Sequence, residues 1–132
     1  EYASEISYFL DNSGEVVFDL LLIQEIMKEF PKIKIDIYVK RSPLLNDVTM
    51  DDTLFAGFKN SHKMRLKELP FDGWVDPQFT DKLHSDIYIL KGQGNYESSS
   101  DAKDVYFLLV VKCEVVSRSL GASIGEMVFK KS

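Results

Sequence analysis

Short apolar runs alternate with longer amphipathic stretches along this 132-residue chain, a pattern typical of strands that alternate with helices. Residues 6–10 read Ile-Ser-Tyr-Phe-Leu, which suits a strand buried on both faces. Apolar residues then recur at helical spacing over residues 16–30, and Pro31 ends this predicted helix. Residues 33–39 form the next strand, and the strand-helix-strand order predicts a right-handed parallel crossover.

The rest of the chain continues this alternation. The pattern predicts, in order, a loop over 40–49, a short helix to about residue 58, a strand over 64–69, a helix over 77–84, a strand over 86–90, a loop over 91–97, a strand over 105–111, a helix over 113–119 and an edge strand over 126–129. We expect residues 98–101, Ser-Ser-Ser-Asp, to be polar and mobile. The whole chain, 1–132, is therefore predicted to be one α/β domain, a three-layer α/β/α sandwich around a mostly parallel, Rossmann-like sheet.

Composition places the chain among ordinary globular proteins, with 45% apolar and 28% charged residues. A net charge of −5 disfavours nucleic acid as a partner, and no run approaches the roughly 18 apolar residues of a membrane span. The single cysteine, Cys113, excludes an intrachain disulfide and a cysteine-rich metal site, so we expect a cytoplasmic protein. The chain begins at Glu1 without a signal peptide, and we expect it to be a fragment of a longer protein.

Polar residues follow four of the predicted strands. Asp11 and Asn12 follow the first strand, residues 46–47 (Asn-Asp) come after the second, residues 91–95 after a later one, and Lys112 closes the most apolar strand. Parallel strands share one carboxyl edge, where open α/β sheets bind their ligands, so these residues are predicted to converge. Taken singly, they have plainer interpretations as a helix cap, a turn and a strand-end lysine that reaches solvent.

The chemistry of the converging groups is that of a hard divalent cation beside an anion. Carboxylate and amide oxygens suit Mg²⁺ or Mn²⁺, which predicts Asp11, Asn12 and Asp47 as metal ligands. Lys91 and Lys112 would balance phosphate charge, and the backbone amides of residues 92–95 form a possible cradle. Together, metal and lysines would stabilise the charge on a transferred group.

The chain contains, in this order, DNSGE with VFDLLLI, SPLLNDVT, SDIYILKGQGNYE and YFLLVVKC. In these motifs it resembles the metal-dependent damage-control phosphatases, long catalogued as a domain of unknown function, over most of residues 6–129. The resemblance implies hydrolysis of phosphate esters of small, often damaged metabolites such as sugar phosphates, with a divalent cation (Mn, Ni, Co or Mg), and neither nucleic acid nor membrane as a partner. It implies metal ligands at Asp11, Asn12 and Asp47. It also implies substrate or phosphate contacts by Lys91, with its adjacent Gly92, and by Asn95.

Two departures from the family pattern limit the resemblance. Some relatives carry Arg-Thr-x-Lys near the C-terminus, whereas residues 109–112 read Leu-Val-Val-Lys here. Only Lys112 carries over, as a substrate or phosphate contact, which implies a branch with a different substrate preference. Relatives also have a helical region before the first strand, which we expect this fragment to lack and to need as a partner for full activity. The sequence leaves open whether Asp11 attacks phosphorus itself or orients a metal-bound water.

A different class of function competes with the phosphatase. A non-catalytic module would bind a nucleotide or phosphometabolite through residues 92–95, although no GxGxxG pattern opens a helix after the first strand. A methyltransferase is disfavoured by the same absence. Glu15 suits either the start of the helix or a place around the metal. Trp74 is expected to lie in the core rather than to act as a lid.

Overall fold

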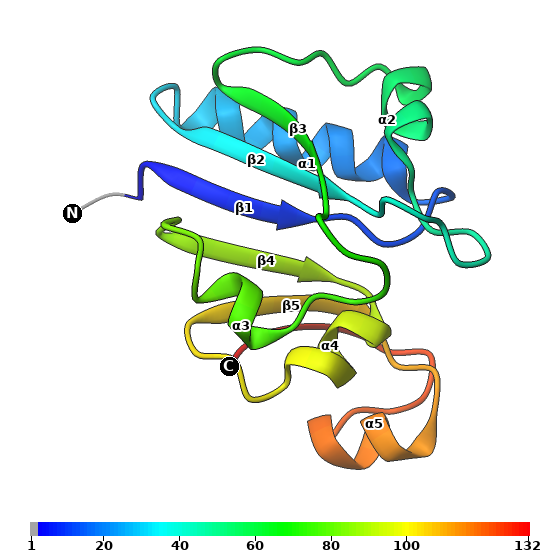
Figure 1. Ribbon diagram of the computed structural model, residues 1–132. Helices are drawn as coiled ribbons and strands as arrows, with labels where there is room; N and C mark the ends of the chain where they lie inside the picture. The colour runs from blue at the N-terminus through cyan, green and yellow to red at the C-terminus, as the bar shows by residue number, and fades with distance from the viewer. Residues whose placement is uncertain (1–2) are drawn as a thin grey trace.

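A single six-stranded sheet organises residues 3–132, which are the residues that the computed structural model describes (Figure 1). Its strand order is β3-β2-β1-β4-β5-β6. The strands are β1 (Glu5–Phe9), β2 (Lys34–Val39), β3 (Met64–Glu68), β4 (Ile87–Lys91), β5 (Val105–Val110) and β6 (Met127–Lys131). The first five run parallel, and only β6 pairs antiparallel, with β5. The mostly parallel sheet predicted from the sequence is confirmed.

Helices lie on both sides of the sheet, as the α/β/α prediction requires. They are α1 (Val16–Glu29), α2 (Met50–Ala56), α3 (Pro77–Thr80), α4 (Gln93–Ser99) and α5 (Glu114–Leu120). One apolar core joins α1 and α2 to the sheet, and a second core joins α3, α4 and α5 to its other face. In Figure 1, α1 lies behind β2 and β3, whereas α3 and α4 lie in front of β4 and β5. Within residues 3–132, no helix is both long and apolar enough to cross a membrane.

Two local predictions were wrong. The stretch over 91–97, predicted to be a loop, leads directly into helix α4, which begins at Gln93. The serines predicted to be mobile end that helix: Ser99 is fully buried and donates a hydrogen bond from Oγ to the carbonyl of Val75 at 2.6 Å. Because Ser98 also donates to that carbonyl, at 2.5 Å, the serine run anchors a loop.

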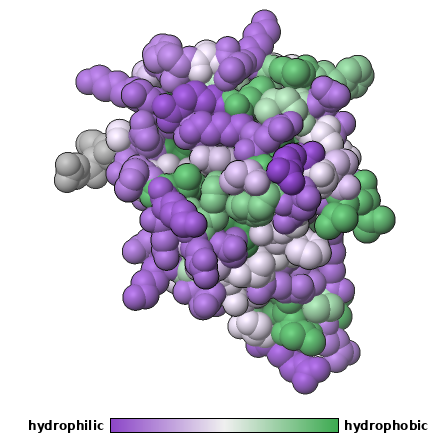
Figure 2. All heavy atoms as spheres, in the orientation of Figure 1, coloured by the Kyte–Doolittle hydropathy of each residue, from purple (hydrophilic) through white to green (hydrophobic). Residues whose placement is uncertain are grey.

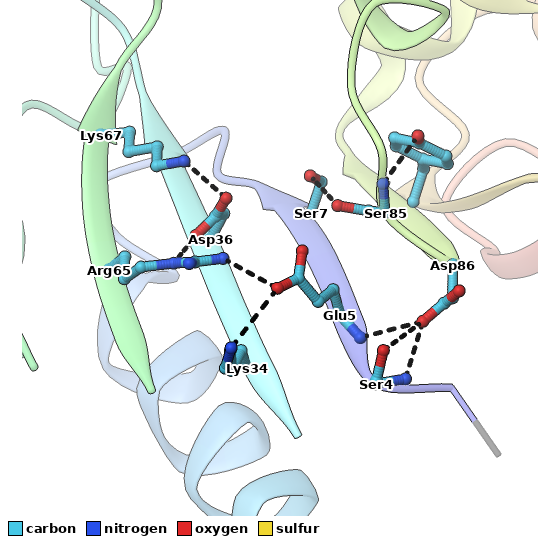
Figure 3. Close-up of polar contacts among 10 residues, drawn as sticks. Ser4, Glu5, Ser7, Lys34, Asp36, Arg65, Lys67, Ser85 and Asp86 are labelled. Atoms are coloured by element: carbon cyan, nitrogen blue, oxygen red, sulfur yellow. Dashed lines mark hydrogen bonds and ion pairs between the residues drawn. The ribbon is translucent and has the colours of Figure 1, made fainter. Parts of the chain in front are cut away.

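Charged side chains rather than a helix cover part of the sheet over β1, β2 and β3, a region that is mainly hydrophilic in Figure 2. Figure 3 shows Asp36 between Lys67 and Arg65, both of which pair with its carboxylate. The Lys67 Nζ lies 2.6 Å from Asp36 Oδ2, and only 7% of Asp36 is exposed. Arg65 also pairs with Glu5 at 3.6 Å, and Lys34 reaches the same carboxylate at 3.8 Å. This network ties three neighbouring strands together near their first residues.

The opposite face of β5 and β6 is apolar and open. Met127 and Phe129 are 71% and 63% exposed, and alternate residues of β5 are only half-buried. A cavity of about 420 Å³ lies over this face and is lined by apolar residues that include Phe30, Ile87 and Tyr106. Because parallel sheets in α/β proteins are normally covered on both sides, this exposed area is a conspicuous gap in the helical layer.

The Asp36 network yields a prediction for stability. Replacing Asp36 with Asn should lower the free energy of unfolding by about 1–3 kcal/mol, because two cations then face each other without their shared carboxylate. The matched control is Lys28→Ala, which breaks an exposed pair with Glu25 and should cost less than about 0.5 kcal/mol. Urea denaturation of both variants measures the difference, and equal losses would show that the Asp36 network contributes no more than a surface pair.

Candidate functional site

The order in which the strands are connected reverses between β1 and β4. These two strands lie side by side, although five elements from α1 to α3 separate them in the chain. The chain leaves β1 toward β2 and leaves β4 toward β5, so the two connections diverge. A crevice at the carboxyl ends of two such strands is the usual ligand site of open α/β sheets. Asp11 follows β1 and Gly92 follows β4, which places both residues at this crevice.

A loop from β2 folds back onto the loop after β1 and brings the predicted metal ligands together. Asn12 and Asp47 form an isolated antiparallel bridge. On either side of it, Val48 donates its backbone N–H to the carbonyl of Asp11 at 2.9 Å, and Ser13 donates to that of Asn46 at 2.8 Å. The convergence at the strand ends that the sequence predicted is therefore produced by backbone hydrogen bonds.

The electrostatics of Asp11 show that the carboxylates lie within range of each other. Burial raises the pKa of Asp11, and the negative charges of Asp47 and Glu15 raise it further. Lys112 and Lys40 act in the opposite direction but do not cancel these effects. Ionisation of Asp11 beside these carboxylates is unfavourable, and a cation bound between Asp11 and Asp47 would offset the repulsion.

Gly92 leaves the space that the Asp11 carboxylate occupies. A Cβ atom at Gly92 would lie 2.1 Å from Asp11 Oδ2, a distance that no real contact allows. The residue also has φ +84° and ψ 158°, a region that is essentially restricted to glycine. Both observations indicate that the turn at the end of β4 is shaped around Asp11.

The other two predicted metal ligands also stabilise local turns. The Oδ1 of Asn12 accepts a hydrogen bond from the N–H of Gly14 at 2.7 Å, and the Oδ2 of Asp47 accepts one from the N–H of Leu44 at 3.1 Å. Both side chains therefore do stabilise turns, as the plainer interpretation of the sequence predicted. Each side chain still has acceptor capacity to spare, because carboxylate and amide oxygens carry two lone pairs.

The donor chemistry at this corner fits a hard divalent cation. Asp11, Asn12 and Asp47 offer two carboxylates and one amide, which are oxygen ligands of the kind that Mg²⁺ and Mn²⁺ take. Residues 3–132 contain no cluster of three or more His, Cys, Asp and Glu side chains arranged to hold a metal. Three ligands from the protein would leave several coordination positions for water or substrate, as is usual for magnesium.

Lys91, predicted to contact phosphate, is enclosed in a buried network. Its Nζ donates to Asp19 Oδ1 at 2.8 Å and to Glu15 Oε2 at 3.0 Å, and Tyr8 also donates to Asp19 Oδ1, at 2.6 Å. Burial alone would lower the pKa of Lys91, but Asp19 and Glu15 outweigh it and the pKa is raised. The structure thus commits this ammonium to two carboxylates, and its contact with phosphate stays a prediction.

Lys112 is the exposed cation of the site. It lines a cavity of about 430 Å³ together with Asp11, Glu15, Lys91 and Gly92. Its backbone N–H donates to Gln93 Oε1 at 2.8 Å, which fixes the strand end, and its side chain is exposed. Among the described residues, its ammonium makes no hydrogen bond or ion pair, so it is available to an anion near Asp11.

Asn95 lies away from the open part of the site. Its side chain is fully buried, and both ends of its amide bond to backbone: Nδ2 donates to the Lys91 carbonyl at 2.9 Å, and Oδ1 accepts from the N–H of Val75 at 3.1 Å. It therefore joins the end of β4 to the loop before α3. A direct contact of this side chain with phosphate stays a prediction.

Sequence reasoning missed Lys40 and misplaced Trp74. Lys40 lies at the end of β2, is only 2% exposed, and pairs with Asp47 at 3.8 Å. It follows its strand as directly as Lys112 follows β5, so the strand-end rule contained a signal for it. Trp74 is 48% exposed rather than in the core. Its ring covers the Lys40 Nζ, 5.1 Å from the ring centroid, and packs so closely on Gly94 that no Cβ would fit there.

The proteins and the family model that this chain is similar to all belong to one family. A model of the damage-control phosphatase ARMT1-like domain matches residues 1–128. The damage-control phosphatase PH1575 of Pyrococcus horikoshii is 35% identical over 134 residues, and a damage-control phosphatase of Archaeoglobus fulgidus is 32% identical over 136. A solved structure of a DUF89 family protein from Pyrococcus horikoshii has a TM-score of 0.80 with 32% identity.

These matches cover nearly all of this chain but less than half of each relative. They include 96% of the chain and 46% of the first relative, 97% and 46% of the second, and 98% and 47% of the solved structure. The chain thus spans about half the length of the curated relatives that it matches.

The close approach of Gly92 to Asp11 yields a prediction for the metal site. Gly92→Ala should displace the Asp11 carboxylate and reduce the rise in melting temperature on adding Mn²⁺ to a small fraction of the wild-type rise. Gly125→Ala is the matched control, because Gly125 has φ +89° but open space where the Cβ would be. Both variants carry a backbone penalty of about 1–3 kcal/mol. Thermal melts with and without Mn²⁺ separate the two effects, and an undiminished response in Gly92→Ala would exclude this role for the glycine.

Proposed function

The chain belongs to the damage-control phosphatase ARMT1-like family, and from this membership and the geometry of its site we propose that it forms the catalytic part of a divalent-metal-dependent phosphatase. The proposed reaction is hydrolysis of phosphate esters of small metabolites, with sugar phosphates as the substrate class. The observation that carries the proposal is the meeting of Asp11 and Asp47 beside the cations Lys40 and Lys112.

Asp11, Asn12 and Asp47 would hold the divalent cation. They fit it because the carboxylates lie close enough for Asp47 to raise the pKa of Asp11, which a bound cation would reverse. When bound, such a cation supplies charge stabilisation for a phosphoryl group and favours ionisation of water. Oxygen ligands of these types can bind Mg²⁺, Mn²⁺, Co²⁺ or Ni²⁺.

The remaining residues would orient the ester and balance its charge. The Lys112 ammonium is exposed and lies near enough to Asp11 to lower its pKa, so it can receive a phosphate oxygen at that edge of the site. Gly92 keeps the Asp11 carboxylate in place by leaving room for it. Lys91 would act from a distance, because it neutralises Asp19 and Glu15 beneath the site.

The size of the cavity next to Asp11 supports a small molecule as the substrate. Its volume is about 430 Å³, and its lining combines charged residues with the apolar side chains of Phe18, Leu22, Leu108 and Met127. A volume of this order accommodates a metabolite rather than a macromolecule. The mixture of charged and apolar walls suits a sugar phosphate, whose ring has both hydroxyl groups and apolar faces.

The non-catalytic module that competed with this proposal gains no support. It relied on an amide cradle over residues 92–95, but the N–H of Gly92 is already bonded to the Leu108 carbonyl at 3.0 Å. The next residues form the first turn of α4, where Trp74 covers Gly94. The proposed cradle therefore lacks the Gly92 N–H, and the Trp74 ring stands against Gly94.

We also propose that the open apolar face of β5 and β6 is covered by the part of the full-length protein that corresponds to the other half of the relatives. The face includes Met127 and Phe129, which are more than 60% exposed. More than half of each relative's length lies outside the match, which supplies enough chain for such a cover. Such a cover would take the part of the helical partner region that we expect from the sequence.

The phosphatase proposal predicts metal-dependent hydrolysis by the full-length gene product. A panel of sugar phosphates should be hydrolysed with Mn²⁺, Co²⁺, Ni²⁺ or Mg²⁺, and EDTA should abolish the activity. Asp11→Asn and Asp47→Asn should each reduce kcat/KM by at least about 100-fold, because each removes a ligand charge. Asp51→Asn, an exposed carboxylate at the start of α2, serves as the control and should retain activity. Hydrolysis that survives EDTA or the two site variants would refute the proposal.

The proposed cover predicts that one substitution has different costs in two forms of the protein. Phe129→Ala should cost about 1–3 kcal/mol of unfolding free energy in the full-length gene product, where the ring would be buried, and less than about 0.5 kcal/mol in the 132-residue chain. Phe55, 96% exposed on α2, is the control, and Phe55→Ala should cost little in both. Equal costs for Phe129→Ala, or a dimer of the 132-residue chain by light scattering that buries this face, would contradict the cover.

A further inference from the structure

Lys40 is the most unusual charged residue of the molecule. Its side chain is 2% exposed, and its Nζ has no hydrogen-bond partner among residues 3–132. Asp47 Oδ2 lies 3.8 Å away, close enough to attract the ammonium but too far for a hydrogen bond. Buried ammonium groups in native proteins are normally hydrogen-bonded, because an unmet donor loses its hydration without compensation.

The surroundings of Lys40 are built around its charge. The Trp74 ring covers the Nζ at 5.1 Å, a distance at which the negative face of the indole attracts a cation. Trp74 is itself held against Gly94 at the start of α4. The ammonium also lies within electrostatic range of Asp47 and Asp11, the two carboxylates of the candidate metal site. Neither Lys40 nor Trp74 lines the cavity that contains Lys112.

The position of this ammonium beside two metal-binding carboxylates limits what its free donors can serve. A metal ion held by Asp11 and Asp47 would repel the ammonium rather than bind it. An anion that reaches the metal would instead find three N–H donors at hand, and charge-assisted bonds to phosphate oxygens are among the strongest hydrogen bonds in proteins. An acceptor with negative charge would therefore suit the donors of Lys40 best.

We propose that Lys40 is an anion-binding residue that receives an oxygen of the phosphate group on the Trp74 side of Asp11 and Asp47. This inference rests on the proposed function for the identity of the anion, but it concerns binding and is testable without turnover. Lys40 and Lys112 would then hold the phosphate from two sides, while Lys91 stays bound to Asp19 and Glu15.

The single tryptophan of the chain provides a direct readout, because Trp74 lies on the Lys40 ammonium. Titration of the 132-residue chain with inorganic phosphate in the presence of Mg²⁺ should change Trp74 fluorescence saturably. In Lys40→Met the phosphate concentration needed for half of the change should rise at least about 10-fold, through loss of a charge-assisted bond. Lys40→Arg should retain binding within a few fold. Lys59→Met, an exposed lysine with the same change in net charge, is the control and should bind as the wild type does.

A second measurement separates anion binding from a purely structural role. If Lys40 only held Asp47 in place, Lys40→Met would lower the melting temperature and weaken Mg²⁺ binding. Under the proposal, the melting temperature is unchanged or higher, because an unbonded buried charge has been removed. Mg²⁺ also binds at least as tightly, because a neighbouring positive charge has gone. Unchanged phosphate binding by Lys40→Met, or weaker Mg²⁺ binding with lost stability, would overturn the proposal.

The two proposals can fail separately. If the full-length gene product does not hydrolyse phosphate esters but phosphate binding depends on Lys40, the anion site stands and the phosphatase proposal falls. If hydrolysis depends on the metal while Lys40→Met binds phosphate and turns over as the wild type does, the role of Lys40 is refuted and the phosphatase proposal stands.

Discussion

The site depends on one backbone constraint, the bridge that ties the loop after β2 to the loop after β1. The bonds from Val48 to Asp11 and from Ser13 to Asn46 flank the Asn12–Asp47 bridge and fix where the two carboxylates lie. Each backbone bond contributes roughly 1 kcal/mol net, which is enough to hold together side chains whose charges repel each other. The fold therefore keeps two mutually repelling carboxylates, Asp11 and Asp47, close together. A cation bound between them would remove this repulsion.

Three lysines at the carboxyl ends of three parallel strands show how similar sequence positions acquire different roles. Lys91 ends β4 beneath α1, where Asp19 and Glu15 take two of its donors. Lys112 follows β5, forms no ion pair within residues 3–132 and remains exposed beside Asp11. Lys40 follows β2 and is enclosed by Trp74 with its donors unmet. The strand-end rule places all three near the site, but only their neighbours decide which of them can meet a ligand.

Those neighbours mark the limit of what the sequence could predict. The strands, helix α1 and the convergence of Asp11 with Asp47 follow from apolar periodicity and the shared carboxyl edge of parallel strands, and the structure confirms them. The pairing of Lys91 with Asp19 depends on which turn of α1 faces β4, and the contact of Trp74 with Lys40 depends on the path of a loop whose pattern is weak. Helix α4 was missed because Gly92, just before it, and Gly94, in its first turn, resemble a loop, although Asn95 and Ser99 anchor the helix through buried hydrogen bonds.

The two sides of the sheet also differ in a way that bears on specificity. Over β1 to β3, Arg65 and Lys67 close one face by pairing with Asp36, so that part needs no further cover. On the other side, the open apolar face of β5 and β6 continues into the wall of the cavity beside Asp11, because Met127 and Leu108 belong to both. Any segment that covers this face must therefore border the cavity as well. These 132 residues would then set the position of the proposed metal ligands and of the neighbouring lysines, while the proposed covering segment would shape the space for the rest of a substrate.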